Sequence, residues 1–254
     1  MENITNKRIG HEIIRLEEIE STNTLIMQTP EYLLNHGLVV VADHQTAGRG
    51  RIGRKWASVP GKQLQFSAVL HPTVPKEQIP VMSLMVAVVV AEAMEKLLGL
   101  APVLKWPNDI LLNEKKVCGI LLELKTLRPK EPLLVVGIGL NCFGPVEEFP
   151  EEIREQTTTL EVEAGKTFDR ETMLSDIMDG LERWFQKLVQ GERGDLVNAW
   201  RSRANLEGCR VRFPTSRGPE EGDVQGVSDE GFLLVKTADG EGWALSSGEL
   251  EWLT

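Results

Sequence analysis

The sequence predicts a mixed α/β (α+β) domain followed by a small all-β region. Short apolar runs with the length and composition of strands alternate with longer segments that suit helices. From Gly208 onward the pattern changes to short strand-like runs separated by Gly and Asp turns. A chain of 254 residues suits one large domain or two unequal ones. We therefore expect two domains, at residues 1–205 and 206–254.

The elements of the first domain follow from local patterns of apolar residues. Strands are expected at residues 13–19, 38–42, 64–70, 103–106, 117–124 and 133–138. Ser21 or Thr22 is a suitable N-cap for a helix after the first strand. Residues 79–98 suit a buried helix, 170–189 an amphipathic helix and 195–204 another helix. The basic segment GRGRIGRKW falls between the second and third strands, so it is predicted to be a loop.

Composition restricts where the protein works and what it binds. A formal net charge of -10 argues against general nucleic-acid or anionic-membrane binding, because such affinity requires an extended basic face. The N-terminal stretch MENITNKRIGHE lacks the apolar core of a signal peptide, and the most apolar run, residues 82–93, is too short to span a bilayer. Cys118, Cys142 and Cys209 form no close pair and no metal-ligand spacing. We expect a soluble, cytoplasmic protein without disulfides and without nucleic-acid or membrane partners.

The segment GRGRIGRKW, residues 48–56, holds four cations and three glycines without one carboxylate. Glycines let backbone N–H groups approach a ligand closely, and arginine side chains offer paired donors that match carboxylate and phosphate oxygens. Because four like charges repel one another, we expect an anionic ligand to order the segment, which would then act as a lid. Taken alone, the segment would more simply be a solvated basic turn or a nucleic-acid patch.

Three further segments carry polar groups on or beside predicted strands. KWPND, residues 105–109, places a cation, a rigid Pro turn and two polar side chains in a row, although ordinary turn chemistry also explains it. KKVCGILLE, residues 115–123, has two lysines before Gly119, and since they alternate in direction only one should face inward. VGIGLN, residues 136–141, has two glycines and a terminal amide, which strand packing alone also explains. Together with the basic segment they favour a local site for a small anion.

In order and spacing these segments resemble the motifs of the biotin protein ligases, which attach biotin to carboxyl-carrier domains. The matching segments are STN at 21–23, QTAGRGRIGRKW at 45–56, KWPND at 105–109, KVCGILLE at 116–123 and GIGLN at 137–141. The resemblance implies a mixed-sheet catalytic domain of the biotin/lipoate ligase type, similar to class II aminoacyl-tRNA synthetases, followed by an SH3-like β-barrel. It also implies two half-reactions. Biotin and ATP give biotinyl-5′-AMP and pyrophosphate, and a lysine of a biotin carboxyl carrier domain then displaces AMP.

The resemblance also assigns roles to residues of this chain. Residues implied in biotin binding are Ser21, Thr22, Asn23, Gln45, Gly48, Arg49, Lys116 and Gly119. Residues implied in binding ATP or the adenylate are Arg51, Arg54, Trp56, Asn108 and Asn141. The implied catalytic residues are Lys116, Arg51, Lys105 and Asp109. Mg²⁺ is expected to accompany ATP, but the resemblance does not identify the protein residues that bind it. Asp109 is implied either as a ligand of Mg²⁺ or as an aid to the attacking lysine.

The chain departs from the family pattern at three places. Asp43 and His44 stand where a Glu-containing pair is common, and GKQ at 61–63 replaces a small residue followed by Asn. The first strand begins near residue 13, so we expect a monofunctional ligase without the N-terminal DNA-binding domain of ligases that double as repressors. Two other functions stay open, a lipoate–protein ligase and a noncatalytic module that senses biotin or an adenylate. A homodimer joined through sheet edges is a further partner that the resemblance allows.

Overall fold

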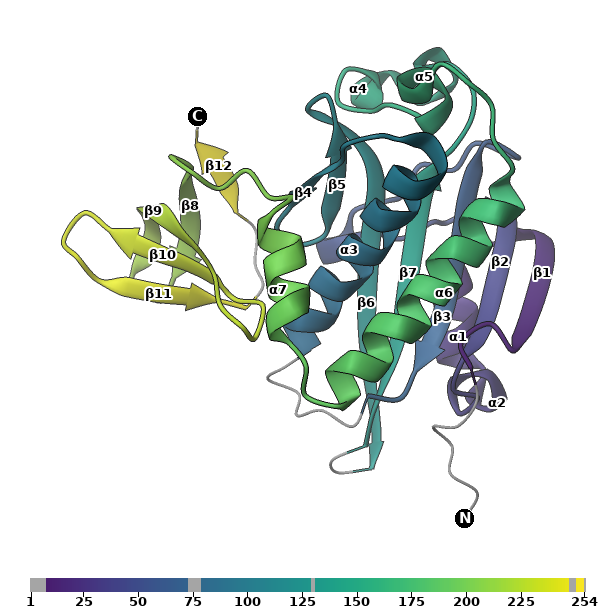
Figure 1. The fold of residues 1–254 in the computed structure, drawn as a ribbon, viewed down its shortest axis with the longest axis horizontal. Helices are drawn as coiled ribbons and strands as arrows, with labels where there is room; N and C mark the ends of the chain where they lie inside the picture. The colour runs from purple at the N-terminus through teal and green to yellow at the C-terminus, as the bar shows by residue number, and fades with distance from the viewer. Residues whose placement is uncertain (1–7, 73–78, 129–130, 247–249, 254) are drawn as a thin grey trace.

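The described part of the chain forms a seven-stranded mixed sheet and a five-stranded antiparallel sheet (Figure 1). The computed structural model describes residues 8–72, 79–128, 131–246 and 250–253. Residues 1–7, which contributed to the argument against a signal peptide, lie outside that part. Long helices cover one face of the large sheet, and the small sheet lies to one side of this layer (Figure 1).

The large sheet has the strand order β1-β2-β3-β7-β6-β5-β4. Its strands are β1 (Glu12–Ile19), β2 (Leu38–Gln45), β3 (Gln63–Leu70), β4 (Val103–Lys105), β5 (Asp109–Leu112), β6 (Lys115–Arg128) and β7 (Glu131–Asn141). β1 and β2 pair in parallel because helices α1 (Thr22–Gln28) and α2 (Pro30–Leu33) form the crossover between them. The other described ladders of this sheet are antiparallel. The prediction of a mixed α/β fold is therefore confirmed, although it missed the short strand β5.

The helices that pack on one face of the large sheet include two of 20 residues and a shorter one (Figure 1). The helices after α2 are α3 (Ile79–Leu98), α4 (Glu151–Arg154), α5 (Leu160–Ala164), α6 (Arg170–Val189) and α7 (Gly194–Arg201). The predicted helices at 79–98 and 170–189 coincide with α3 and α6. Asp169 caps α6 by accepting from the backbone N–H groups of Glu171 and Thr172. No helix in the described part of the chain is long and apolar enough to cross a membrane.

Side chains of the large sheet alternate between two cores. Val39 and Val41 of β2 point into the larger core, which α3, α6 and α7 cover. Leu38 and Val40 point to the opposite face, where α1 and α2 cover a smaller core. The loop of residues 48–56 lies over this second face, because its tryptophan rests on glycines of β6 and β7. The candidate site therefore forms beside α1, on the face away from the long helices.

The C-terminal region forms a five-stranded antiparallel sheet in the order β11-β10-β9-β8-β12. Its strands are β8 (Arg210–Thr215), β9 (Gly218–Val227), β10 (Leu233–Thr237), β11 (Gly242–Leu245) and β12 (Glu251–Leu253). Burial alternates along β8, where Val211 and Phe213 are buried between exposed neighbours. This is the pattern of a strand with one face on a core. The predicted change to an all-β region after Gly208 is confirmed.

The small sheet is joined to the large domain beside the KWPND turn. The Trp106 indole N–H donates to the Gly231 carbonyl oxygen at 3.1 Å, and the Arg201 guanidinium donates to the Val227 carbonyl oxygen. Gly231 has a φ of 89°, and a Cβ atom there would lie 2.7 Å from the Val81 nitrogen. Glycine is therefore required for the turn to approach α3 this closely. The joint brings the C-terminal sheet next to the turn that carries predicted site residues.

Candidate active site

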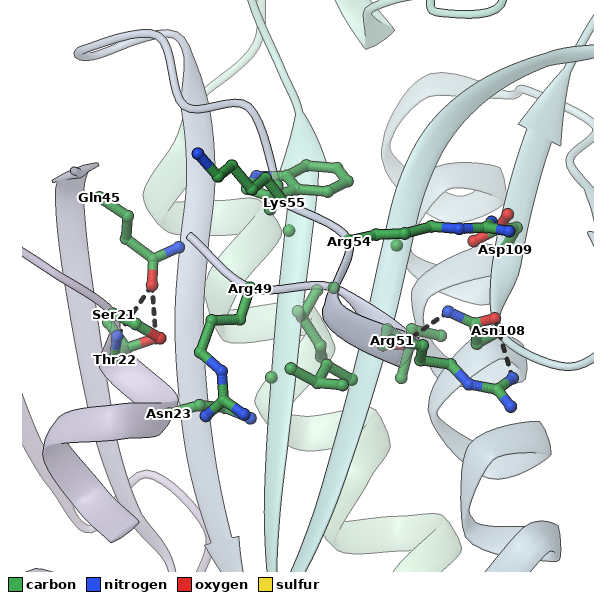
Figure 2. A pocket seen from close by; sticks show the side chains of 18 of the residues that line it. Ser21, Thr22, Asn23, Gln45, Arg49, Arg51, Arg54, Lys55, Asn108 and Asp109 are labelled. Atoms are coloured by element: carbon green, nitrogen blue, oxygen red, sulfur yellow. Dashed lines mark hydrogen bonds between the residues drawn. The ribbon is translucent and has the colours of Figure 1, made fainter. Parts of the chain in front are cut away.

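A pocket lies between the 48–56 loop and the second face of the large sheet (Figure 2). Segments far apart in the sequence meet there: the start of α1, the end of β2, the loop, the turn before β5, and β6. The predicted site residues that line the pocket are Ser21, Thr22, Asn23, Gln45, Arg49, Arg51, Arg54, Trp56, Asn108, Asp109, Lys116 and Gly119. Gly48, Lys105 and Asn141 lie outside its lining.

One end of the pocket carries neutral polar side chains. Ser21 caps α1 with its hydroxyl group, and the Thr22 backbone N–H donates to Gln45 Oε1 at 2.8 Å. The Thr22 hydroxyl oxygen is 2.6 Å from that of Ser67 on β3. Ser21, Thr22 and Asn23 are buried and offer hydroxyl and amide groups, and the Arg49 guanidinium lies beside them. Such groups suit a neutral ligand that both donates and accepts hydrogen bonds.

Glycines form the floor of the pocket beneath Trp56. A Cβ atom on Gly119 would lie 2.9 Å from the indole ring, and one on Gly139 would lie 2.4 Å from it. Gly119 of β6 and Gly139 of β7 are directly paired, so the ring rests on bare backbone. The Trp56 indole N–H is buried and donates to no atom of the described residues. Burying a donor without a partner is costly, which favours a ligand or water that accepts from it.

The 48–56 loop closes on itself as a narrow turn. The Trp56 N–H donates to the Gly48 carbonyl oxygen at 2.9 Å, and the Gly50 N–H donates to the Arg54 carbonyl oxygen at 2.7 Å. Ile52 at the tip has φ 53° and ψ 45°, a left-handed conformation that β-branched residues rarely adopt. The cavity under the loop measures about 130 Å³, which is less than the roughly 300–1,000 Å³ of typical ligand pockets. The space beneath the loop is therefore narrow.

Lys116 reaches the pocket at the start of β6. Its Nζ atom is 2.6 Å from Asp109 Oδ1 and 5.8 Å from the centre of the Trp56 ring. The neighbouring Lys115 is exposed, so the prediction that only one of the two lysines faces inward is confirmed. The ion pair with Asp109 holds the Lys116 ammonium at the pocket wall.

Arg51 and Arg54 lie at the end of the pocket away from α1 (Figure 2). Arg51 donates to the Asn108 amide oxygen at 3.2 Å, and the Asn108 amide donates to the Ile120 carbonyl oxygen at 2.9 Å. Burial lowers the pKa of the Arg51 guanidinium, and the Asp109 carboxylate opposes that shift. An arginine remains charged even so. Because Arg54 lines the same pocket, this end can bind an anionic group such as phosphate.

Two predicted residues lie next to the pocket. Gly48 is within the loop itself. Lys105 lines an adjoining cavity together with Arg51, and its Nζ atom is 5.7 Å from the centre of the Trp252 ring on the C-terminal sheet. The arginine end of the pocket therefore continues toward Lys105 and the small sheet.

Asn141, the last residue of β7, is buried and lies outside the pocket lining. Its amide oxygen accepts from Gln63 Nε2 at 2.8 Å, and its amide nitrogen donates to the Thr158 carbonyl oxygen at 3.1 Å. The residue is 3% exposed. Both polar ends of the amide are thus used inside the protein, and the structure does not bring Asn141 to the pocket. Its contact with adenine stays a prediction that requires an exchange of partners.

Sequence reasoning assigned no role to polar groups that the structure places beside the pocket. Glu123 of β6 lies 2.8 Å from Arg49 Nη2 and accepts from Asn23 Nδ2 at 2.9 Å. Gln65 of β3 accepts from Gln45 Nε2 at 2.9 Å and orients that amide. A charged or amide side chain inside an otherwise apolar strand could have indicated these residues, because such a group needs a partner when it is buried.

Of the residues that the structure describes, no cysteine side chain belongs to the pocket lining. Cys118 and Cys142 are buried and free, and burial raises the pKa of both thiols, that of Cys142 to about 12. They are protonated at neutral pH and are therefore poor nucleophiles. Among the described residues, no group of three or more His, Cys, Asp or Glu side chains is placed to hold a metal ion.

Comparisons with known proteins identify the family. Residues 16–141 match the sequence model of the Biotin/lipoate A/B protein ligase family, and residues 208–251 match that of the Biotin protein ligase C terminal domain. The Bifunctional ligase/repressor BirA of Bacillus subtilis is 33% identical over 232 residues, which cover 91% of this chain and 71% of that protein. The chain belongs to the biotin protein ligase family.

Two further biotin protein ligases are similar over most of their length. The biotin–acetyl-CoA-carboxylase ligase of Mycobacterium tuberculosis is 31% identical over 221 residues, which cover 84% of this chain and 78% of that protein. The structure of the biotin protein ligase from Aquifex aeolicus in complex with biotin and ATP has a TM-score of 0.81 and 33% identity. That comparison covers 96% of this chain and 99% of the other. The family and the mixed α/β fold predicted from the sequence are confirmed.

Proposed function

We propose that this chain is an ATP-dependent biotin protein ligase, which makes biotinyl-5′-AMP and transfers its biotinyl group to a lysine of a carrier domain. The observation that carries the proposal is the polarity of the pocket. Neutral hydroxyl and amide groups occupy one end, where Arg49 is paired with Glu123, and Lys116, Arg51 and Arg54 lie further along the pocket. The neutral end suits the ureido ring of biotin, Lys116 its carboxylate, and the arginines the phosphates of ATP.

In the first step a biotin carboxylate oxygen attacks the α-phosphorus of ATP. The bond between that phosphorus and the bridging oxygen of the β-phosphate breaks, and pyrophosphate leaves. Lys116 neutralises the carboxylate, so that two anions can approach each other. Lys116 and Arg51 then stabilise the negative charge that develops on the phosphate oxygens. Asp109 keeps Lys116 in place through the ion pair at 2.6 Å.

In the second step the neutral amine of a carrier lysine attacks the acyl carbon of biotinyl-5′-AMP. The bond from this carbon to the phosphate oxygen breaks, AMP leaves, and the nitrogen loses a proton to solvent water as the amide forms. Among the described residues, Asp109 is the carboxylate that lines the pocket, so we assign it to hydrogen-bond the incoming amine. Arg51 and Arg54 hold the AMP phosphate during this attack.

Mg²⁺ is proposed to enter with ATP. In nucleotide sites this ion is bound by one or two protein carboxylates, substrate phosphates and water, and it rarely has a complete protein cage. Asn108 and Asp109 provide side-chain oxygens in the pocket, but Asn108 Oδ1 accepts from Arg51 and Asp109 Oδ1 pairs with Lys116. The ion would therefore be held mainly by substrate phosphates and water. When bound, Mg²⁺ would neutralise part of the phosphate charge.

The acceptor is proposed to be a biotin carboxyl carrier protein or domain, and the site of action the cytoplasm. Residues 1–205 are proposed as the catalytic domain and 206–254 as the C-terminal domain. The net charge of -10 supports a partner other than nucleic acid.

Release of pyrophosphate tests the proposal. The purified chain with ATP and Mg²⁺ should release pyrophosphate when biotin is added, and should then transfer biotin to a carrier domain. Lipoate in place of biotin is the control and should support no release. Release with lipoate alone would identify a lipoate–protein ligase, and biotin binding without release would identify a noncatalytic module. Either result would refute the proposal.

A further inference from the structure

A carboxylate lies beside a pocket that otherwise suits anions. The side chain of Glu123 is 17% exposed. It projects from the same face of β6 as Gly119, because positions 119, 121 and 123 alternate with positions that point into the helix-covered core. A negative charge here repels the carboxylate and the phosphates of the proposed substrates. Its presence therefore needs a compensating role.

The contacts of Glu123 join two segments that are far apart in the sequence. One carboxylate oxygen is 2.8 Å from Arg49 Nη2, and the other accepts from Arg49 Nη1 at 3.1 Å and from Asn23 Nδ2 at 2.9 Å. Arg49 belongs to the 48–56 loop and Asn23 to α1. Figure 2 shows the Arg49 side chain extending from the loop toward Asn23. A two-point contact of this kind fixes the direction of the guanidinium as well as its place.

We propose that Glu123 is a positioning residue for the biotin end of the pocket. It anchors Arg49, and with it the first half of the 48–56 loop, to β6, and it sets the direction from which the guanidinium meets biotin. The guanidinium has five N–H groups, so its bonds to Glu123 leave donors for a ligand in the pocket that Arg49 lines. The pair also neutralises one loop cation before a ligand arrives. This inference rests on the proposed function.

Lys125 is the matched control residue, because substituting it tests the effect of losing a contact with α1 while the contact with the loop remains. It projects two positions further along the same face of β6, and its Nζ atom donates to the Met27 carbonyl oxygen at 3.0 Å. Glu123 and Lys125 therefore hold opposite ends of α1 against β6. The described hydrogen bond of Lys125 goes to α1, whereas Glu123 contacts both α1 and the 48–56 loop.

Glu123→Gln is the test, because glutamine keeps the length of the side chain and an oxygen for Asn23 but removes the charge that holds Arg49. In biotin-dependent pyrophosphate release, the KM for biotin should rise about tenfold while kcat stays within about threefold, since the lost contact acts on binding. Trypsin cleaves after Arg and Lys, and it should cut the ligand-free variant within residues 49–55 about tenfold faster than wild type. Lys125→Met should leave the KM and the cleavage rate close to wild type.

The double variant of Arg49→Gln and Glu123→Gln should be no worse than Arg49→Gln alone, since Glu123 acts through Arg49. Equal effects of Glu123→Gln and Lys125→Met would overturn the proposal, because Glu123 would then only anchor α1. An unchanged KM and cleavage rate, or tighter biotin binding, would also overturn it. If the wild type released no pyrophosphate with biotin, the proposed function would fail, and the trypsin comparison would still decide whether Glu123 holds the loop. Thermal unfolding confirms that each variant is folded.

Discussion

Lys116 and Lys115 are neighbours in the chain, but Lys116 lines the pocket beside Asp109 and Lys115 is exposed. Lys116→Ala should leave the fold intact and slow biotinyl-5′-AMP formation by about 100-fold or more, because a cation at the reacting oxygens contributes on the order of 3 kcal/mol to the transition state. Lys115→Ala is the matched control and should keep nearly the wild-type rate. Single-turnover pyrophosphate release measures both. Normal release by folded Lys116→Ala would remove Lys116 from the mechanism.

His36 should make the stability of the fold depend on pH. The residue is 1% exposed, and its ring centre lies 5.4 Å from that of Phe185. Burial lowers the pKa of His36 from 6.5 to about 4, and burial also lowers the pKa of the adjacent His71. As the pH falls below 6.5, the unfolded chain binds a proton that the folded chain excludes until about pH 4. Acid therefore favours the unfolded chain throughout this interval.

Urea unfolding at pH 7 and pH 5 measures the effect. His36 alone should lower the free energy of unfolding by about 2 kcal/mol between these two values. His36→Asn should reduce the difference between the two pH values by that amount, whatever its effect at pH 7. His44→Gln is the control, because His44 is partly exposed and pairs with Glu18. A pH dependence that His36→Asn does not change would contradict the assignment.

Most of the residues that form the site could be predicted from the sequence, but the hydrogen bonds between them could not. Lys116, Arg51 and Asn108 belong to motifs whose order and spacing are specific, and the structure brings them together. The bond between Asn141 and Gln63 could not be foreseen, since it depends on how β7 pairs with β3. Gln63 was noted only as a departure from the family pattern. Residue type shows that a buried amide needs a partner, but it does not show which one.

At the scale of elements, the 48–56 loop is the segment on which closure of the pocket depends. Arg51→Gly removes a phosphate-binding side chain and adds backbone freedom. The variant should still form biotinyl-5′-AMP but release it before a carrier binds, so that lysines of bystander proteins become biotinylated. Blotting for biotin on added albumin measures this. Arg217→Gly, in the exposed turn after β8, is the control, and labelling confined to the carrier would contradict the lid.

Ligands should also protect the loop from proteolysis. Biotin with ATP should suppress trypsin cleavage within residues 48–56, because closure over the adenylate removes these bonds from solvent. Either ligand alone should protect less than both together. Equal cleavage with and without ligands would favour a static basic turn.

Long elements could be predicted from the sequence, whereas short ones could not. α3 and α6 have 20 residues each, and a pattern sustained over that length leaves few alternatives. β5 has four residues directly after a turn, which is too short for a period to be recognised. β6 continues beyond the predicted residue 124 because its hairpin with β7 continues to pair there. That extension depends on the partner strand.

At the scale of the whole molecule, Gly231 and Gly240 separate backbone strain from contact between the C-terminal region and α3. Their φ angles are 89° and 90°, but a Cβ atom on Gly231 would lie 2.7 Å from the Val81 nitrogen, whereas one on Gly240 would meet open space. Each substitution by Ala should cost about 1 kcal/mol for the positive φ. Gly231→Ala should cost roughly 1–3 kcal/mol more, because the C-terminal sheet must move away from α3. Thermal unfolding measures the difference, and equal losses would contradict a tight joint.

Because of the strand order of the large sheet, one edge of β3 stays unpaired while the chain is being synthesised. β3 ends at Leu70, but β7, its neighbour toward the sheet centre, begins at Glu131. A ribosome that adds roughly 5–20 residues per second needs roughly 3–12 s to reach it. During this interval the unpaired edge of β3 is open to strands of other nascent chains. The yield of folded protein should therefore depend on how fast the segment from β3 to β7 is translated, and on how many chains are made side by side.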